Sequence, residues 1–409
     1  MRFGFISTRF AGTDGVSLES AKWAQVLEQS GQQVFWFCGL SDRPETITQI
    51  VPEAHFEHPD IVALNEAIWG KDHLPATVTA AVETIRQHLR QEIEAFITSR
   101  NIDVLVPQNA LTIPMNIPLA LALADVIRET GIPTLAHHHD FYWERDRFTG
   151  NAAKPWLDEA FPPVLDSIRH VVINHAAKRD LESRFSLKAT VIPNVMNFAE
   201  AATGIDDYAA DLRKEIGLEE TDRLILQPTR IVPRKGIELS IELLARLSDD
   251  RNKLIISHDS GDEGHRYLDT LRKLANSKNV DLRLIGNRIA TKRTLAGDGS
   301  KLYTLHDLYP HADFITFPSL YEGFGNALLE AIHFGKPLLV NRYSVFKEDI
   351  EPVGLNLILI DGAITDETVA EAARWLETPP DPERNRTLAT KHFGYEVLRE
   401  RLGELLRTL

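Results

Sequence analysis

Short apolar runs alternate with longer stretches of helical periodicity from one end of this 409-residue chain to the other. Apolar runs of strand length that alternate with helices are typical of βαβ units, which build parallel sheets. One series of strands is predicted in the first half and a fresh series begins at Arg223, which favours two doubly wound halves over one very wide sheet. The predicted fold class is therefore α/β. The predicted strands are Arg2–Ser7, Gln33–Cys38, Asp103–Pro107, Pro133–His137, His170–Ile173, Arg223–Gln227, Lys253–His258, Val280–Ile285, Phe314–Phe317 and Pro337–Asn341, and helices predicted between the early strands are Leu18–Gln29, Ala76–Thr98 and Leu119–Thr130.

The sequence also indicates where the two halves join. The chain is long enough for two domains of about 100 to 200 residues each. The segment Asn197–Thr221 has few strand signals and contains Asp206-Asp207, so we expect the linker there. Adjacent prolines at Pro379–Pro382 break helix and sheet, and an amphipathic helix is predicted after them at Val397–Leu409. We predict an N-terminal domain at residues 1–197 that takes in the terminal helix at about 386–409, and a C-terminal domain at residues 198–385.

Charge and composition exclude several kinds of partner. The formal net charge is -14, and an acidic surface repels the phosphates of nucleic acids and anionic lipids. The sequence has no apolar stretch near the roughly 20 residues of a membrane span, and no secretory signal is expected at its start. Cys38, the one cysteine, lies in an apolar run and is expected to be buried and inert. We therefore expect a cytoplasmic protein without nucleic-acid or membrane partners, and the sequence indicates no oligomeric state.

The segment Tyr321–Ala331 follows the predicted strand Phe314–Phe317 and continues into a helix. Its glycine-containing loop at Gly323–Asn326 lets backbone amides approach an anion, and the helix dipole adds favourable potential. Glu322 and Glu330 do not suit a phosphate, but they suit the hydroxyl groups of a ribose or hexose. An isolated Glu-Gly-x-Gly would be a simple helix start, so the interpretation also depends on a second segment. The candidate ligand-binding residues here are Glu322, Gly323, Phe324, Gly325, Asn326 and Glu330.

The second segment is Gln227–Gly236, at the carboxyl end of the first strand of the second half. Ligands of open α/β sheets bind outside the carboxyl ends of the strands, so cations at this place favour an anionic ligand. Arg230 offers a planar fork of donors and Lys235 a point charge, a combination that suits a diphosphate. The alternative is that both are solvated surface cations.

Together these segments resemble the donor-binding half of the family 4 retaining glycosyltransferases. Arg230 and Lys235-Gly236 match the family's Arg…Lys-Gly element, and Glu322 and Glu330 match its two glutamates separated by seven residues. The resemblance implies the GT-B fold, in which two Rossmann-like domains face each other across a cleft and the C-terminal helix crosses back to the N-terminal domain. It further implies that Arg230 and Lys235 hold the donor diphosphate, that Glu322 contacts the transferred sugar, and that Glu330 contacts the nucleotide ribose.

The resemblance continues outside these motifs. Val191–Asn194 is similar to the family's Ile-Pro-Asn-Gly, although Val195 replaces the glycine. Ile256–Gly261 departs from the family, which has a Gly-x-Gly turn at this place.

Two loops of the first half contain further candidates. Phe10–Ser17 joins a strand to a helix, and its glycines suit either an ordinary turn or the approach of a ligand. The family's equivalent loop faces the donor, which makes Gly15 the candidate there. His139-Asp140 matches the family's His-Asp after a strand, which implies that His139 lies near the transferred sugar.

The neighbouring histidines leave more than one interpretation open. A zinc site at His137–His139 is not favoured, because adjacent residues point in different directions and no matching ligand cluster is evident. His137 and His138 are either core residues or acceptor-side residues. Glu144–Arg147 is either a solvated charged loop or part of an acceptor site. The acceptor-binding candidates are His138, Asp140 and Arg147.

The predicted function is transfer of a hexose, with retention, from a UDP-, GDP- or ADP-linked donor to a small soluble acceptor such as a sugar phosphate, a glycerate derivative or a saccharide. The resemblance implies front-side attack within an ion pair, with the departing phosphate taking the acceptor's proton. No metal and no cofactor is required, and magnesium is at most stimulatory. The alternatives are a GT-B epimerase or phosphorylase and a non-catalytic protein that binds nucleotide sugars. The predicted catalytic residues are His139, Arg230, Lys235 and Glu322.

Overall fold

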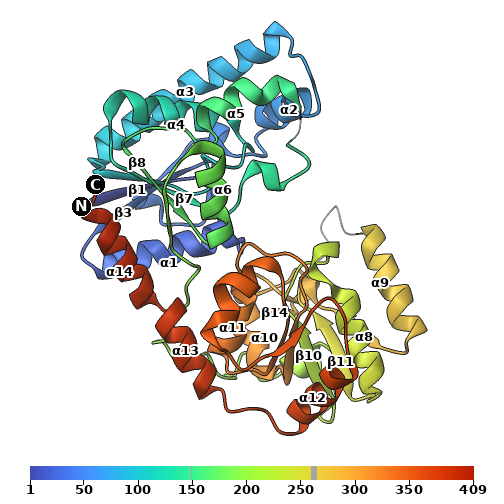
Figure 1. The fold of residues 1–409 in the computed structure, drawn as a ribbon. Helices are drawn as coiled ribbons and strands as arrows, with labels where there is room; N and C mark the ends of the chain where they lie inside the picture. Colours follow the sequence, from blue (N-terminus) through green and yellow to red (C-terminus); the bar gives the residue numbers. More distant parts are fainter. Residues whose placement is uncertain (149, 259–264) are drawn as a thin grey trace. The chain divides into compact units, whose positions relative to one another are not determined.

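The structure is a computed structural model that describes residues 1–148, 150–258 and 265–409, and it consists of two compact units (Figure 1). Unit 1 contains Met1–Asn194 and Glu396–Leu409, and unit 2 contains Val195–Tyr395. The segment Asn197–Thr221 belongs to unit 2, where Ala209 and Leu212 are fully buried. Asp259, Ser260 and Gly261, in the segment that departs from the family's turn, lie outside the described residues.

Unit 1 is built on a seven-stranded sheet in the order β5-β3-β1-β6-β7-β8-β9. All neighbouring strands are parallel, so their carboxyl ends lie at one edge, where ligands of such sheets bind. β1, β6 and β7 are adjacent in the middle of the sheet, which brings together the loops that follow them. The strands are β1 (Arg2–Ile6), β3 (Gln33–Cys38), β5 (Thr48–Ile50), β6 (Val104–Pro107), β7 (Thr134–His138), β8 (Ile168–Val172) and β9 (Ala189–Val191), beside a small pair formed by β2 (Arg9–Phe10) and β4 (Leu40–Ser41).

Helices bury apolar faces against this sheet. α4 (Ile117–Thr130) is buried from Ile117 to Ile127 and begins at Asn116, whose side chain accepts a hydrogen bond from the Leu119 amide at 3.0 Å. α1 begins at Gly15 after the N-cap Asp14. The helices of this unit are α1 (Gly15–Gln29), α2 (Pro59–Ile68), α3 (Ala76–Arg100), α4, α5 (Lys154–Ala160) and α6 (His175–Phe185), together with α14 (Tyr395–Leu406), which belongs to unit 1 from Glu396 onward.

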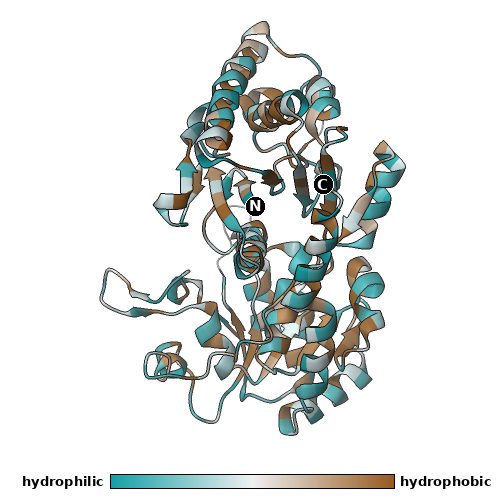
Figure 2. Ribbon diagram, turned by 90° about the vertical axis from the view of Figure 1, so that its left-hand side faces the viewer, coloured by the Kyte–Doolittle hydropathy of each residue, from teal (hydrophilic) through white to brown (hydrophobic). Residues whose placement is uncertain are grey.

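Unit 2 has a six-stranded parallel sheet in the order β12-β11-β10-β15-β16-β17. Figure 2 shows that the strands of both units are mainly hydrophobic, whereas the helices have hydrophilic residues on part of their surface. The strands are β10 (Arg223–Gln227), β11 (Asn252–Ile256), β12 (Asp281–Leu284), β15 (Phe314–Phe317), β16 (Leu338–Asn341) and β17 (Ile358–Ile360), with a hairpin of β13 (Thr294–Leu295) and β14 (Lys301–Leu302). The helices are α7 (Leu212–Glu215), α8 (Ile237–Leu247), α9 (His265–Ser277), α10 (Leu305–Leu308), α11 (Asn326–His333), α12 (Asp366–Glu377) and α13 (Glu383–Phe393).

The structure confirms the α/β class and two Rossmann-like sheets, and each predicted strand is present with bounds that differ by at most two residues. The edge strands β5, β9 and β17 were not predicted, since each has three residues and too few positions for an apolar pattern. Within the described parts of the chain, none of the helices combines the length and hydropathy needed to cross a bilayer.

Candidate active site

In unit 2, two loops meet where the adjacent strands β10 and β15 end. The Leu320 amide donates to the carbonyl of Arg234 at 2.8 Å, which joins the two loops directly. Gln227, at the end of β10, donates from its side chain to the Lys235 carbonyl at 2.9 Å. Gly236 has a φ of 60°, and a Cβ there would lie 2.4 Å from the carbonyl oxygen of Pro318. Only glycine allows the loops to approach this closely.

The approach of these loops pairs Lys235 with Glu322. The Lys235 ammonium donates to Oε1 of Glu322, and both side chains are only 11% exposed. Arg234 contacts the other carboxylate oxygen at 3.2 Å and the Tyr321 carbonyl at 3.1 Å. Burial lowers the pKa of Lys235, while Glu322 acts in the opposite direction. Both oxygens of Glu322 are therefore occupied by cations.

Arg230 adds a further positive charge beside this pair. Its side chain is exposed, and its positive charge contributes to lowering the pKa of Lys235. Arg230 forms no ion pair with any residue that the structure describes. Lys235 and Arg234 contact the single carboxylate of Glu322, Arg230 adds a third positive charge, and the excess of positive charge suits an anionic ligand. Arg234 was not among the site residues predicted from the sequence, although it directly precedes Lys235 in the same segment.

The glycine loop leads from Glu322 into α11. Gly325 has a φ of 124°, and a Cβ there would lie 2.6 Å from the Tyr343 hydroxyl. The same hydroxyl donates to the Phe324 carbonyl, and the Phe324 ring is buried. Tyr343 therefore fixes the loop whose residues Gly323 to Asn326 bring backbone amides to the start of α11, an arrangement that favours an anion.

Glu330 lies on α11 and is half-buried. Its Oε2 accepts a hydrogen bond of 2.8 Å from the hydroxyl of Tyr309, a buried residue whose ring stacks on Phe334 with centroids 4.9 Å apart. Burial, with the nearby Glu330 charge, raises the pKa of Tyr309 well above its ordinary value, so the phenol stays protonated and donates. Tyr309 was not found from the sequence, because no motif marks it.

In unit 1, the candidates lie at the start of α1 and on the loop after β7. Gly15 is the first residue of α1, and a Cβ added there would meet no atom within 4 Å. Its neighbour Asp14 caps the helix by accepting hydrogen bonds of 3.1 Å from the amides of Val16 and Ser17. The space beside Gly15 is therefore open.

His139 follows β7 directly and is half-buried. Its Nε2 lies 3.2 Å from Oε1 of Gln108, and its backbone amide donates to Asn109 at 2.9 Å. Burial lowers the pKa of His139 to about 4, an effect that Asp140 and Asp14 partly offset. His139 is consequently neutral at neutral pH.

The acceptor-side candidates have different surroundings in the structure. His138 is 1% exposed and its Nε2 lies 2.9 Å from Nδ1 of His170, which places it in the core of unit 1. Asp140 accepts a hydrogen bond of 2.6 Å from Asn109 and pairs with Arg145. Arg147 lies over the Phe148 ring, 4.5 Å from its centroid. No group of three or more metal-ligating side chains is arranged to hold an ion among the described residues.

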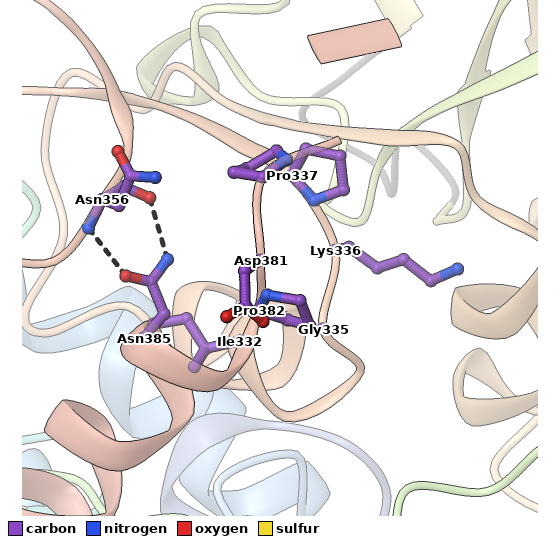
Figure 3. A pocket seen from close by; sticks show the side chains of 9 residues that line it. Ile332, Gly335, Lys336, Pro337, Asn356, Asp381, Pro382 and Asn385 are labelled. Atoms are coloured by element: carbon purple, nitrogen blue, oxygen red, sulfur yellow. Dashed lines mark hydrogen bonds between the residues drawn. The ribbon is translucent and has the colours of Figure 1, made fainter. Parts of the chain in front are cut away.

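A small pocket of unit 2 lies elsewhere (Figure 3). It is lined by residues at the end of α11, before β16 and at the start of α13, which places it at the amino end of β16 and not at the carboxyl ends of the strands. Asn385 and Asn356 exchange two hydrogen bonds of 2.7 and 2.8 Å there, so these polar groups satisfy each other. The pocket is not part of the candidate site.

The two Rossmann-like sheets, and the cations and glycine loop at one sheet edge, define a GT-B glycosyltransferase. Residues 209–392 match the family model described as Glycosyl transferases group 1. The chain is 32% identical to mannosylglucosylglycerate synthase of Petrotoga mobilis over 88% of this chain and 86% of that protein, and 31% identical to mannosylglucosylglycerate synthase of Thermotoga maritima over 98% and 99%. The chain therefore belongs to the group 1, or family 4, glycosyltransferases.

Solved structures share the fold at low sequence identity. Anabaena HepE in complex with UDP and glucose matches with a TM-score of 0.66 at 14% identity, covering 100% of both chains. Sucrose-phosphate synthase from Thermosynechococcus elongatus matches with a TM-score of 0.66 at 15% identity, covering 100% of this chain and 98% of that one.

Proposed function

We propose that this glycosyltransferase transfers a hexose, with retention, from a nucleoside diphosphate sugar to a small acceptor that contains glycerate. The donor part of the proposal is supported by the ion pairs of Lys235 and Arg234 with Glu322 and by the additional positive charge of Arg230. The acceptor part is supported by the two relatives named mannosylglucosylglycerate synthase. Transfer of mannose to glucosylglycerate would give the product in that name, so we propose glucosylglycerate as the acceptor.

The proposed donor site uses the residues at the sheet edge of unit 2. Arg230 and Lys235 hold the diphosphate, and the amides of Gly323 to Asn326 add donors. Glu322 contacts the transferred sugar, while Glu330 contacts the ribose. Breaking the donor bond builds charge on the phosphate oxygens, and cations that are already fixed stabilise this charge without reorganising.

Unit 1 contributes the remaining groups in this proposal. Gly15 leaves room for the donor, and His139 contacts the transferred sugar. Asp140 and Arg147 act on the acceptor side, whereas His138 is buried in unit 1 and is not proposed to contact the acceptor. We also propose a cytoplasmic location, which agrees with a single buried cysteine that can form no disulfide within the chain.

The proposed reaction needs no carboxylate nucleophile. The bond between the anomeric carbon and the diphosphate oxygen breaks, a bond to the acceptor oxygen forms on the same face, and the acceptor's proton passes to the departing phosphate. Both oxygens of Glu322 are engaged by Lys235 and Arg234, which supports a positioning role for this carboxylate rather than attack on the sugar. Arg230, Arg234 and Lys235 together carry two more charges than Glu322 balances, and this excess stabilises the leaving group, so we propose that turnover requires neither cofactor nor divalent metal.

The test is an assay with defined substrates. GDP-mannose, UDP-glucose and ADP-glucose are each incubated with glucosylglycerate, glycerate or glucose 6-phosphate, with and without EDTA, and products are identified by mass spectrometry. The anomeric coupling in the NMR spectrum of the product shows whether configuration is retained. Transfer to glucosylglycerate with retention is expected. Binding without turnover would favour a non-catalytic protein, and a requirement for orthophosphate would favour a phosphorylase.

A further inference from the structure

Gln108 links two histidines at the carboxyl edge of the unit 1 sheet. It directly follows β6, pairs with His137 through a parallel β-bridge, and is fully buried. Its side-chain oxygen Oε1 lies 2.9 Å from Nδ1 of His137 and 3.2 Å from Nε2 of His139. An amide oxygen has two lone pairs and is able to accept a hydrogen bond from each ring.

We infer that Gln108 is a positioning residue that holds His139 in the tautomer with its proton on Nε2, so that Nδ1 is presented as an acceptor for a hydroxyl group of the substrate. The inference rests on the proposed function for the identity of that substrate, a hexosyl donor. It assigns His139 a specific chemical role, because a neutral imidazole carries one proton and the contact made by one nitrogen decides the state of the other.

The surroundings hold both rings in place. His137 stacks on Trp23 of α1 with centroids 4.2 Å apart, and the His139 ring lies 4.4 Å from the His137 ring. The backbone amide of His139 is fixed by Asn109 at 2.9 Å. Nδ1 of His139 forms no hydrogen bond with any residue that the structure describes. The His139 ring is therefore held at Nε2 by Gln108, and Nδ1 is available to a ligand.

The electrostatic environment keeps His139 neutral. The charged groups that act on it are Asp140 on its own loop, Asp14 at the start of α1 and Lys22 in the middle of α1, and His137 packs against its ring. Burial lowers the pKa of His139 to about 4. Near neutral pH a bare Nδ1 accepts a hydrogen bond, and this role does not depend on a positive charge on the ring.

The tautomer is tested without any enzymatic activity. Protein labelled with ¹⁵N-histidine is compared with His139→Ala to assign the ring nitrogens of His139 in long-range ¹H–¹⁵N spectra. We expect Nε2 to be protonated and Nδ1 to be bare in the wild-type chain. The opposite tautomer would show that the Gln108 amide is turned around and donates to the rings, which would overturn the inference.

Kinetics test whether Gln108 acts through His139. Gln108→Met should lower kcat by about tenfold with little change in the KM of the donor, and the double variant with His139→Ala should be no slower than His139→Ala alone. Gln108→Glu keeps the acceptor oxygen and should restore most of the activity, while its negative charge raises the pKa of His139 and moves the acid limb of kcat to higher pH. Ser7→Ala is the matched control, because among the described residues the Ser7 hydroxyl donates only to the backbone carbonyl of Gln108, at 2.9 Å, and not to its side chain.

The possible failures are distinguishable. Losses that add in the double variant, or that only follow a lower melting temperature, would show that Gln108 has a structural role alone. If the wild-type chain transfers no sugar from any donor, the proposed function fails, whereas the NMR result still decides the tautomer.

Discussion

Glu322 accepts a hydrogen bond from Lys235, although the two residues are 87 positions apart in the sequence. Each side chain is only 11% exposed, and Arg234 approaches the second oxygen of Glu322 at 3.2 Å. A buried charge that loses its partner destabilises a protein more than replacement of the whole pair does. A substitution of only one member of this pair is therefore expected to destabilise unit 2.

Removing one member of this pair should destabilise the protein strongly. Lys235→Met leaves Glu322 without its buried partner and should lower the free energy of unfolding by about 3 kcal/mol. The double variant Lys235→Met/Glu322→Leu should be less destabilised than the sum of the two single variants, because it leaves no uncompensated charge. Denaturant unfolding of the four proteins measures this coupling. Strictly additive losses would show that the pair does not contribute as a unit.

Arg230→Ala should leave the stability of the protein unchanged but weaken ligand binding. The side chain is exposed and has no ion pair among the described residues, so the melting temperature should remain unchanged. Loss of a charge-assisted contact to the diphosphate should weaken nucleoside diphosphate binding by about 1.5–3 kcal/mol, which is roughly tenfold or more. Isothermal titration calorimetry measures the affinity.

The matched control for Arg230 is Arg251→Ala. Arg251 pairs with Asp249 at 2.6 Å and precedes β11, so it lies at the amino edge of the same sheet. Its removal should leave nucleotide affinity unchanged. Equal losses in both variants would point to a general charge effect instead of a diphosphate contact.

Tyr309→Phe should weaken recognition of the ribose. The Tyr309 hydroxyl donates to Glu330 at 2.8 Å and orients the carboxylate that we propose to bind the ribose hydroxyls. Its removal should weaken binding of a nucleoside diphosphate by about 1 kcal/mol, roughly fivefold, but should weaken binding of the 2′,3′-dideoxy analogue much less. Calorimetry with both ligands gives the comparison, and an equal loss for both would contradict a role through Glu330.

The alternation of apolar runs and helical stretches was sufficient to predict the central strands of both sheets. The short edge strands β5, β9 and β17 could not be predicted in this way, because pairing with a longer neighbour stabilises them more than their own three residues do. The resemblance to family 4 predicted Lys235 and Glu322, which the structure places in contact.

Tertiary neighbours of the motifs could not be predicted. Arg234 contacts Glu322, Tyr309 contacts Glu330, and Gln108 contacts His139. The two residues of each pair are far apart in the sequence and are brought together by the fold, so no local sequence pattern marks them. The polar pair Gln108-Asn109 directly after the apolar strand β6 was the one available signal in unit 1. Loops at the carboxyl ends of parallel strands are where such pairs have functional roles.

The buried histidines of unit 1 should make the protein sensitive to acid. Burial lowers the pKa of His170 from 6.5 to about 4 and lowers the pKa of its neighbour His138 well below the ordinary value. Between those two pH values the unfolded chain binds a proton that folded His170 does not, so the stability that is present above pH 6.5 is lost as the pH falls toward 4. Each such histidine contributes a slope of about 1.4 kcal/mol per pH unit.

His170→Gln should reduce this sensitivity while keeping a hydrogen-bonding group opposite His138, whose Nε2 lies 2.9 Å from Nδ1 of His170. The free energy of unfolding of the variant should fall less steeply between pH 6.5 and 4.5 than that of the wild-type chain, by up to about 1.4 kcal/mol per pH unit. Denaturant unfolding followed by tryptophan fluorescence at several pH values measures both slopes. His88→Gln is the control, because His88 lies on the surface of the same unit with a side chain that is 43% exposed. If His170→Gln and His88→Gln show the same slope as the wild-type chain, the acid sensitivity arises outside the His138–His170 pair.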